Sequence, residues 1–130
     1  MILKSPLRVP KSKSGMFSLN LNQYRNAHYQ VLNSAKRSYK SLMFAQIQAL
    51  PELDKISLTY TLYPKDRRIC DLDNMLAVQC KFFQDALVEL GRLPEDNIHH
   101  IRAIDFRYGE VDKDNPRVEI EIESCLFISV

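Results

Sequence analysis

Two aspartates lie one residue apart in the segment "CDLDN", directly after the basic segment "PKDRR". In an extended segment, Asp71 and Asp73 point to the same side and can share one cation, while Leu72 points into the core and anchors them. Carboxylate oxygens are the hard ligands that Mg²⁺ and Mn²⁺ prefer. Such ions can orient an attacking water and stabilise a leaving 3′-oxygen. The spacing is therefore a candidate metal site, although surface turns also contain Asp-x-Asp.

Three neighbouring features strengthen this prediction. Arg67 and Arg68 lie just upstream, where they can meet a phosphate. The "EDN" segment at 95–97 supplies further carboxylates after the next expected helix. Asp73 and Asn74 open that helix, and such residues cap free backbone amides in any protein. Helix capping is therefore the purely structural alternative for one member of the pair.

Histidine and glycine chemistry is less well supported by the sequence. His99 and His100 are adjacent in an expected strand, so they point to opposite faces and cannot both bind one ion. His28 falls on the first expected helix, and a nuclease of the ββα-metal type would lack its paired ligands. With 3 glycines in the chain, a glycine-rich phosphate loop is excluded.

Apolar periodicity predicts the elements that position these residues. Apolar side chains alternate cleanly over 56–62, which predicts a strand that leads directly into the Asp pair. Spacings of three and four predict a helix over 73–90 that stops at Gly91. An earlier helix is expected over 24–50, with a basic flank and with Pro51 as its stop signal.

The remaining segments predict short strands. Residues 2–9 are expected to form an edge strand and 16–22 a second short strand. Residues 98–111 and 116–125 are expected to form a final hairpin across "DKDNP", with Val118, Ile120 and Ile122 facing inward. The order β(β)-α-β-α-β-β predicts an α+β fold with a mixed or antiparallel sheet and two main helices. At 130 residues, 1–130 is expected to be a single domain.

Composition favours a soluble protein with an anionic partner. Apolar residues make up 45% of the chain and charged residues 26%, no stretch is long enough to span a membrane, and the N-terminus lacks a signal peptide's apolar region. Cys70, Cys80 and Cys125 match no zinc or disulfide spacing, which favours a cytoplasmic protein with reduced thiols. Residues 1–68 hold 12 Lys/Arg against 3 Asp/Glu, whereas 69–130 hold 6 against 13. The basic half predicts binding to nucleic acid, unless the two halves pair with each other.

The segment "DRRICDLDN", a helix containing a lysine and "QDAL", a glycine and "PEDN" together resemble the RusA-type Holliday-junction resolvases of bacteria and their prophages. The resemblance covers about residues 56–100, and "NQYRNAH" at 22–28 is similar to the family less specifically. It implies that Asp71, Asp73 and Asp96 bind the catalytic Mg²⁺ or Mn²⁺. Asn74 matches the asparagine that follows the second aspartate.

The family's catalytic lysine lies one helical turn after this asparagine, where the chain has Ala77. Lys81 lies one turn further on, and a four-residue insertion leaves it on nearly the same helix face. Lys81 is therefore predicted to assist catalysis electrostatically. The alternative is an ordinary solvated helix lysine.

The expected helix also creates a distance problem, because Asp96 follows its far end, about 27 Å from its start. A two-fold homodimer with antiparallel helices would bring Asp96 of one chain to the Asp pair of the other. Apolar residues at 4-3-4-3 spacing form a seam that such helices could share. The seam consists of Leu76, Cys80, Phe83, Leu87 and Leu90.

The expected function is therefore a Mg²⁺-dependent, structure-selective endonuclease that acts on branched DNA as a homodimer. Basic residues outside the apolar stripes are expected to contact DNA phosphates. They are Arg67, Arg68, Lys11, Lys13, Arg25, Lys36, Arg37 and Lys40. A non-catalytic DNA-binding protein with the same fold is the first alternative. A structural or interaction protein that uses the acidic half is the second.

Overall fold

The mixed sheet consists of four strands, which are β1 (Ile2–Ser5), β4 (Ile56–Tyr63), β5 (Ile101–Tyr108) and β6 (Arg117–Ser124). Their order in the sheet is β1-β6-β4-β5. Strands β1 and β6 pair antiparallel, as do β6 and β4, whereas β4 and β5 are parallel. A separate pair is formed by β2 (Arg8–Pro10) and β3 (Met16–Ser18). The predicted α+β class with a mixed sheet is confirmed.

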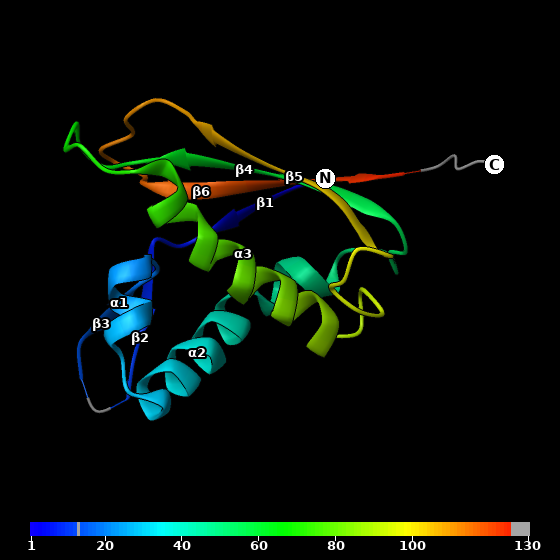
Figure 1. Cartoon of the computed structure of the whole chain (residues 1–130), viewed down its shortest axis with the longest axis horizontal. Coiled ribbons are helices and arrows are strands. Elements are labelled where there is room, and N and C mark those ends of the chain that lie inside the picture. Colours follow the sequence, from blue (N-terminus) through cyan, green and yellow to red (C-terminus); the bar gives the residue numbers. More distant parts are fainter. Residues whose placement is uncertain (13, 126–130) are drawn as a thin grey trace.

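The computed structural model describes residues 1–12 and 14–125, which contain three helices. They are α1 (Leu21–Asn26), α2 (Tyr29–Gln48) and α3 (Leu72–Glu89). Figure 1 shows α2 and α3 on the same side of the sheet. In the part of the chain that the structure describes, no helix is both long and apolar enough to cross a membrane.

The single helix expected over 24–50 is divided into α1 and α2. Ala27 is extended (φ −83°, ψ 141°) and ends α1. His28 then caps α2, because its Nδ1 accepts the backbone N–H of Gln30 at 3.2 Å. A histidine cap lets the chain change direction without glycine or proline, so apolar spacing alone did not reveal the break.

The expected final hairpin is wrong, because β4 lies between β5 and β6. Val118 of β6 lies opposite Leu62 of β4, and Ile120 lies opposite Tyr60. All four side chains are fully buried, so apolar burial favours this central pairing over a local one. Strand β5 instead reaches the far side of β4 after the α3 crossover. The inward orientation predicted for Val118, Ile120 and Ile122 is confirmed.

The apolar seam of α3 is largely buried within one chain. Leu76, Phe83 and Leu87 have no exposed surface, and the Phe83 ring meets Tyr60 of β4 edge-on, with centroids 6.3 Å apart. A helix-to-helix dimer through this seam is therefore wrong, since the seam stabilises α3 against its own sheet.

A buried polar network fixes both long helices to β1. The Ser5 hydroxyl lies 2.8 Å from the Tyr39 hydroxyl of α2 and donates to Oε1 of Gln79 on α3 at 2.6 Å. Gln79 also donates from Nε2 to the carbonyl of Pro6 at 2.8 Å. Because the buried polar groups bond to one another, α3 is held in one orientation.

Candidate metal centre

Asp71 and Asp73 lie at the start of α3, beyond the carboxyl end of β4. Asp71 is the cap residue, with extended angles (φ −85°, ψ 132°) and no side-chain cap hydrogen bond. Asp73 lies in the first turn, where its Oδ1 accepts the backbone N–H of Asn74 at 2.9 Å. The predicted extended geometry of the pair is wrong, because the helix already begins at Leu72. Leu72 does pack against the core, as predicted.

The two carboxylates are exposed, and neither forms an ion pair within residues 1–12 and 14–125. The N-terminus of a helix carries a partial positive charge that favours anionic side chains. Mg²⁺ is commonly held by one or two carboxylates together with waters and substrate phosphates. Asp71 and Asp73 therefore fit a magnesium ion by ligand type and by accessibility.

Asp96 lies at the opposite end of α3. The helix has 18 residues and is therefore about 27 Å long, and Asp96 lies in the exposed turn that follows it. The pKa of Asp85, near this end of α3, is raised mainly by partial burial, and the negative charge of Asp96 contributes to that rise. Among the described residues, no three His, Cys, Asp or Glu side chains are grouped to hold a metal ion. One chain thus supplies two of the three predicted ligands at this place.

Lys81 is exposed about halfway along α3. Its Nζ lies 5.8 Å from the centre of the Tyr24 ring on α1, an arrangement suited to a cation–π contact. Asp73 is eight residues earlier, which corresponds to about 12 Å along the helix axis. The lysine therefore lies beside α1 at a distance from the Asp pair.

Arg67 and Arg68 lie in the loop between β4 and α3, and both are exposed. The Arg68 backbone N–H donates to Asp66 Oδ1 at 3.0 Å, and its Nη2 lies 3.9 Å from Asp66 Oδ2. Arg67 has no ion pair with any described residue. The loop thus presents positive charge within a few residues of the carboxylate pair.

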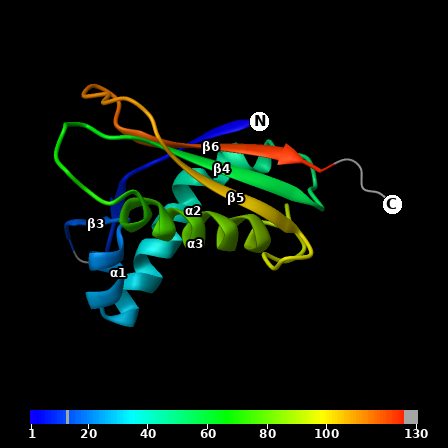
Figure 2. The same ribbon diagram turned by 45° about the horizontal axis from the view of Figure 1, so that its top comes forward.

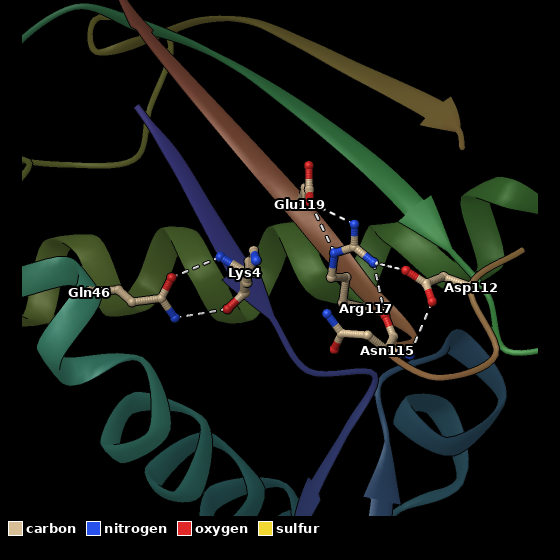
Figure 3. A network of polar contacts seen from close by, with 6 residues as sticks. All are labelled: Lys4, Gln46, Asp112, Asn115, Arg117 and Glu119. Carbon is tan, nitrogen blue, oxygen red and sulfur yellow. Dashed lines mark hydrogen bonds and ion pairs between the residues drawn. The ribbon is translucent and has the colours of Figure 1, made fainter. Parts of the chain in front are cut away.

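A second loop supports this end of the sheet. The Asp112 backbone N–H donates to the carbonyl of Pro64 at 2.8 Å, which links the 109–116 loop to the end of β4. Arg117 holds Asp112 at 2.8 Å and Glu119 at 2.9 Å, as Figure 3 shows. These ion pairs, first of all the hydrogen bond to Glu119, raise the pKa of Arg117. The loop before the Asp pair is therefore attached to a fixed neighbour.

The predicted DNA-contacting residues divide into two groups. Lys36 and Lys40 of α2 form ion pairs with Asp85 (3.8 Å) and Glu89 (3.2 Å) of α3. These two lysines therefore connect the helices. The other described members, which are Lys11, Arg25, Arg37, Arg67 and Arg68, form no ion pair with α3. Lys13 lies outside the described residues.

Sequence reasoning missed a hollow beside α1, which polar side chains line together with Phe17, Ala27 and Val31. Its volume is about 390 Å³, and its lining includes Asn22, Gln23, Asn26, His28 and Lys11. The amide-rich run before His28 is the signal that could have located it. Ala27 and His28, at the break between α1 and α2, belong to its lining, and periodicity did not predict that break.

A scan against protein-family models and a search of curated proteins gave no match to the chain. The resemblance to RusA-type resolvases therefore stays a prediction from the residues themselves.

Proposed function

We propose that the protein is a Mg²⁺-dependent endonuclease that resolves four-way DNA junctions in recombination and repair. The observation that carries this proposal is the exposed carboxylate pair, Asp71 and Asp73, without an ion-pair partner among the described residues. Neighbouring carboxylates repel each other, and a bound cation removes that cost. The exposed Arg67 nearby supplies the charge that a phosphate substrate needs.

The chemistry assigned to each residue follows from its position. A Mg²⁺ ion held there would supply Lewis-acid activation of the phosphate and of an attacking water. Asp71 and Asp73 would hold the ion through their carboxylate oxygens, and Mn²⁺ accepts the same ligands. Arg67 and Arg68 would orient the phosphate next to it. Lys81 would stabilise negative charge that develops on the DNA.

A homodimer belongs to this proposal, because Asp96 and the Asp pair lie at opposite ends of α3. A second copy could supply Asp96, and two sites related by a two-fold axis suit paired nicks on opposed strands. Mixing Asp71→Asn chains with Asp96→Asn chains tests this arrangement. A shared site predicts partial recovery of cleavage in the mixture, and a mixture as inactive as either variant would count against it.

The decisive experiment compares a four-way junction with a linear duplex of equal sequence, with and without Mg²⁺. We expect Mg²⁺-dependent nicks in the junction, and we expect Asp71→Asn to abolish them while DNA binding survives. No cleavage of either substrate would exclude the enzyme. Equal cleavage of both would leave a nuclease without junction preference.

A non-catalytic DNA-binding protein is the second candidate. The position of Lys81 beside Tyr24 favours it, since the lysine lies about 12 Å along the helix from Asp73. This candidate predicts junction binding without nicks at any Mg²⁺ concentration. An interaction protein that uses its acidic half would bind DNA weakly or not at all.

The proposed setting is the bacterial cytoplasm, with a prophage as one source of such a chain. The free thiols of Cys70, Cys80 and Cys125 support a reducing compartment.

A further inference from the structure

Strand β5 forms one edge of the four-stranded sheet, and β4 is its one strand neighbour in the described part of the chain. Figure 2 shows β5 as the outermost strand in front of β4. At 8 residues it is as long as β4, and it contains no proline. A long free edge is a template for pairing with another strand.

The apolar side chains of β5 are poorly covered on the face that meets the helices. Ile104 lies beside Leu58 of β4 and is 47% exposed, whereas Leu58 is 1% exposed. Tyr108 lies beside Leu62 and is 58% exposed, whereas Leu62 is 0% exposed. The helix-facing side of the sheet therefore extends beyond the area that the helices of one chain cover.

We propose that β5 pairs antiparallel with β5 of a second copy of this chain, about a two-fold axis at Phe106. In this register Phe106 lies opposite the partner's Phe106, Asp105 opposite the partner's Arg107, and Ile104 opposite the partner's Tyr108. The two sheets of four strands become one sheet of eight. The strand that occupies the free edge of β5 is thus β5 of a second copy.

The sequence of β5 selects this register over its neighbours. Residues directly opposite in an antiparallel pair lie on the same face, so the axis must pass through a residue and not between two. An axis at Asp105 would place two aspartates opposite each other, and an axis at Arg107 two arginines. An axis at Ile104 would place Arg102 opposite the partner's Phe106. Phe106 is the centre that pairs opposite charges on one face and apolar side chains on the other.

The charged face of β5 is already arranged for this pairing. Arg107 Nη2 lies 3.0 Å from Asp105 Oδ2 within the chain, and the two side chains are 65% and 62% exposed. A second copy adds the reversed pair beside it, so that four charges alternate around the axis. Charge patterns of this kind specify a register more than they raise affinity.

Two highly exposed apolar side chains lie toward opposite ends of β5. Ile98, in the turn before the strand, is 80% exposed, and Ile69, in the loop after the carboxyl end of β4, is 96% exposed. Because the pairing is antiparallel, the end that carries Ile98 in one copy approaches the end that carries Ile69 in the other.

Charge exchange tests the register, with the dimer dissociation constant measured by sedimentation. Asp105→Arg and Arg107→Asp each place like charges opposite one another twice, so each should raise that constant by at least about tenfold. An equal mixture of the two variants restores opposite charges in a mixed dimer, as does the double variant Asp105→Arg/Arg107→Asp in a homodimer. Both should return the constant to near the wild-type value.

Glu123→Arg is the matched control, because it makes the same change of charge on an exposed position of β6, two strands away from the free edge. It should leave the dissociation constant unchanged, and far-ultraviolet circular dichroism should show that every variant folds. A monomeric wild type, or single variants that dimerise like the wild type, would overturn the proposal. The interface rests on the sheet edge, so an inactive protein that dimerises this way contradicts the nuclease proposal alone.

Discussion

Both ends of α3 carry acidic side chains, but the two ends differ in whether these carboxylates form ion pairs. At the first end, the carboxylates of the 71–73 segment are exposed and form no ion pair within the described residues. At the second end, Asp85 pairs with Lys36 at 3.8 Å and Glu89 pairs with Lys40 at 3.2 Å. Acidic residues at the two ends of one helix thus divide into a pair open to a cation and a pair that faces lysines of α2.

This difference changes how the charge of the molecule is interpreted. Lys36 and Lys40 count toward the basic half of the sequence, yet in the fold they face acidic partners. Such exposed pairs contribute little to stability, but they lower the positive charge that α2 offers to DNA. The exposed Arg37 on the same helix has no ion pair with a described residue. The largest effects on the proposed function are therefore expected at the first end of α3.

Removal of one carboxylate from each end is the strongest test of this contrast. Asp71→Asn should lower the rate of Mg²⁺-dependent junction cleavage by at least about a hundredfold, because it removes a charged metal ligand. Glu89→Gln also removes one carboxylate from α3 and should keep the rate within about twofold of the wild type. Single-turnover cleavage of a labelled junction measures both. Equal losses in the two variants would contradict the distinction between the ends.

The reactivity of the cysteine thiols should differ between the exposed start of α3 and its partly buried middle. Burial raises the pKa of Cys80 to about 11, so at neutral pH its thiolate is about a hundredfold rarer than that of an ordinary cysteine. Cys70 is exposed immediately before Asp71. Maleimide should therefore modify Cys70 at least about a hundredfold faster than Cys80, as measured by mass spectrometry of the peptides.

Unfolding in urea is the control, since both thiols should then react at similar rates. Junction DNA bound at the Asp pair should slow the modification of Cys70. Rapid modification of Cys80 in the folded protein would contradict its position in the interior of α3.

The salt dependence of DNA binding distinguishes Arg37 from Lys40 on α2. Each lost phosphate contact reduces the slope of log affinity against log salt by about 1. Arg37→Gln should show this reduction, whereas Lys40→Gln should leave the slope unchanged because Lys40 is paired with Glu89. Titrations of a junction at several salt concentrations measure the slope. An equal reduction in both variants would mean that the Lys40–Glu89 pair opens on binding.

Local patterns predicted the elements better than their pairing. The alternation of apolar residues in 56–62 identified β4, because a strand buried on one face has apolar residues at every second position of its own sequence. The strand that pairs with β5 depends on where α3 places the chain. A strand in a hairpin and a strand after a helical crossover can show the same alternation of apolar and polar residues, so the pattern does not reveal the partner. The cap at His28 was missed because histidine is rarely the signal for a helix start. Strand pairing is non-local, so one sequence did not determine it.

The candidate site shows the same division. Asp71 and Asp73 were located by type and spacing, but their geometry was wrong because Asp71 caps the helix and Asp73 is already helical. The pairing of Lys36 with Asp85 joins residues 49 positions apart, and no local pattern predicts it. A sequence thus indicates which groups can do chemistry, while the fold decides which of them are left without a partner.

The smallest expected effect concerns the stability of the second end. Partial burial raises the pKa of Asp85 above its ordinary value, against the opposing effect of Lys36. Such a carboxyl holds its proton more tightly in the folded protein than in the unfolded one. Its contribution to stability is therefore greatest at low pH and declines as the pH rises through the raised pKa. Asp85→Asn removes this decline.

Relative to the wild type, Asp85→Asn should gain stability between acidic and neutral pH, by less than about 1 kcal/mol because the carboxylate is partly exposed. Urea unfolding at pH 3.5 and at pH 7 measures the gain. The first pH is about half a unit below the ordinary pKa of an aspartate carboxyl, and the second is well above it. Asp114→Asn, in an exposed loop, is the control and should show no such trend. A difference of the opposite sign would show that Lys36 outweighs burial, and the second end of α3 would then be stabilised by its ion pairs more than it is destabilised by burying charge.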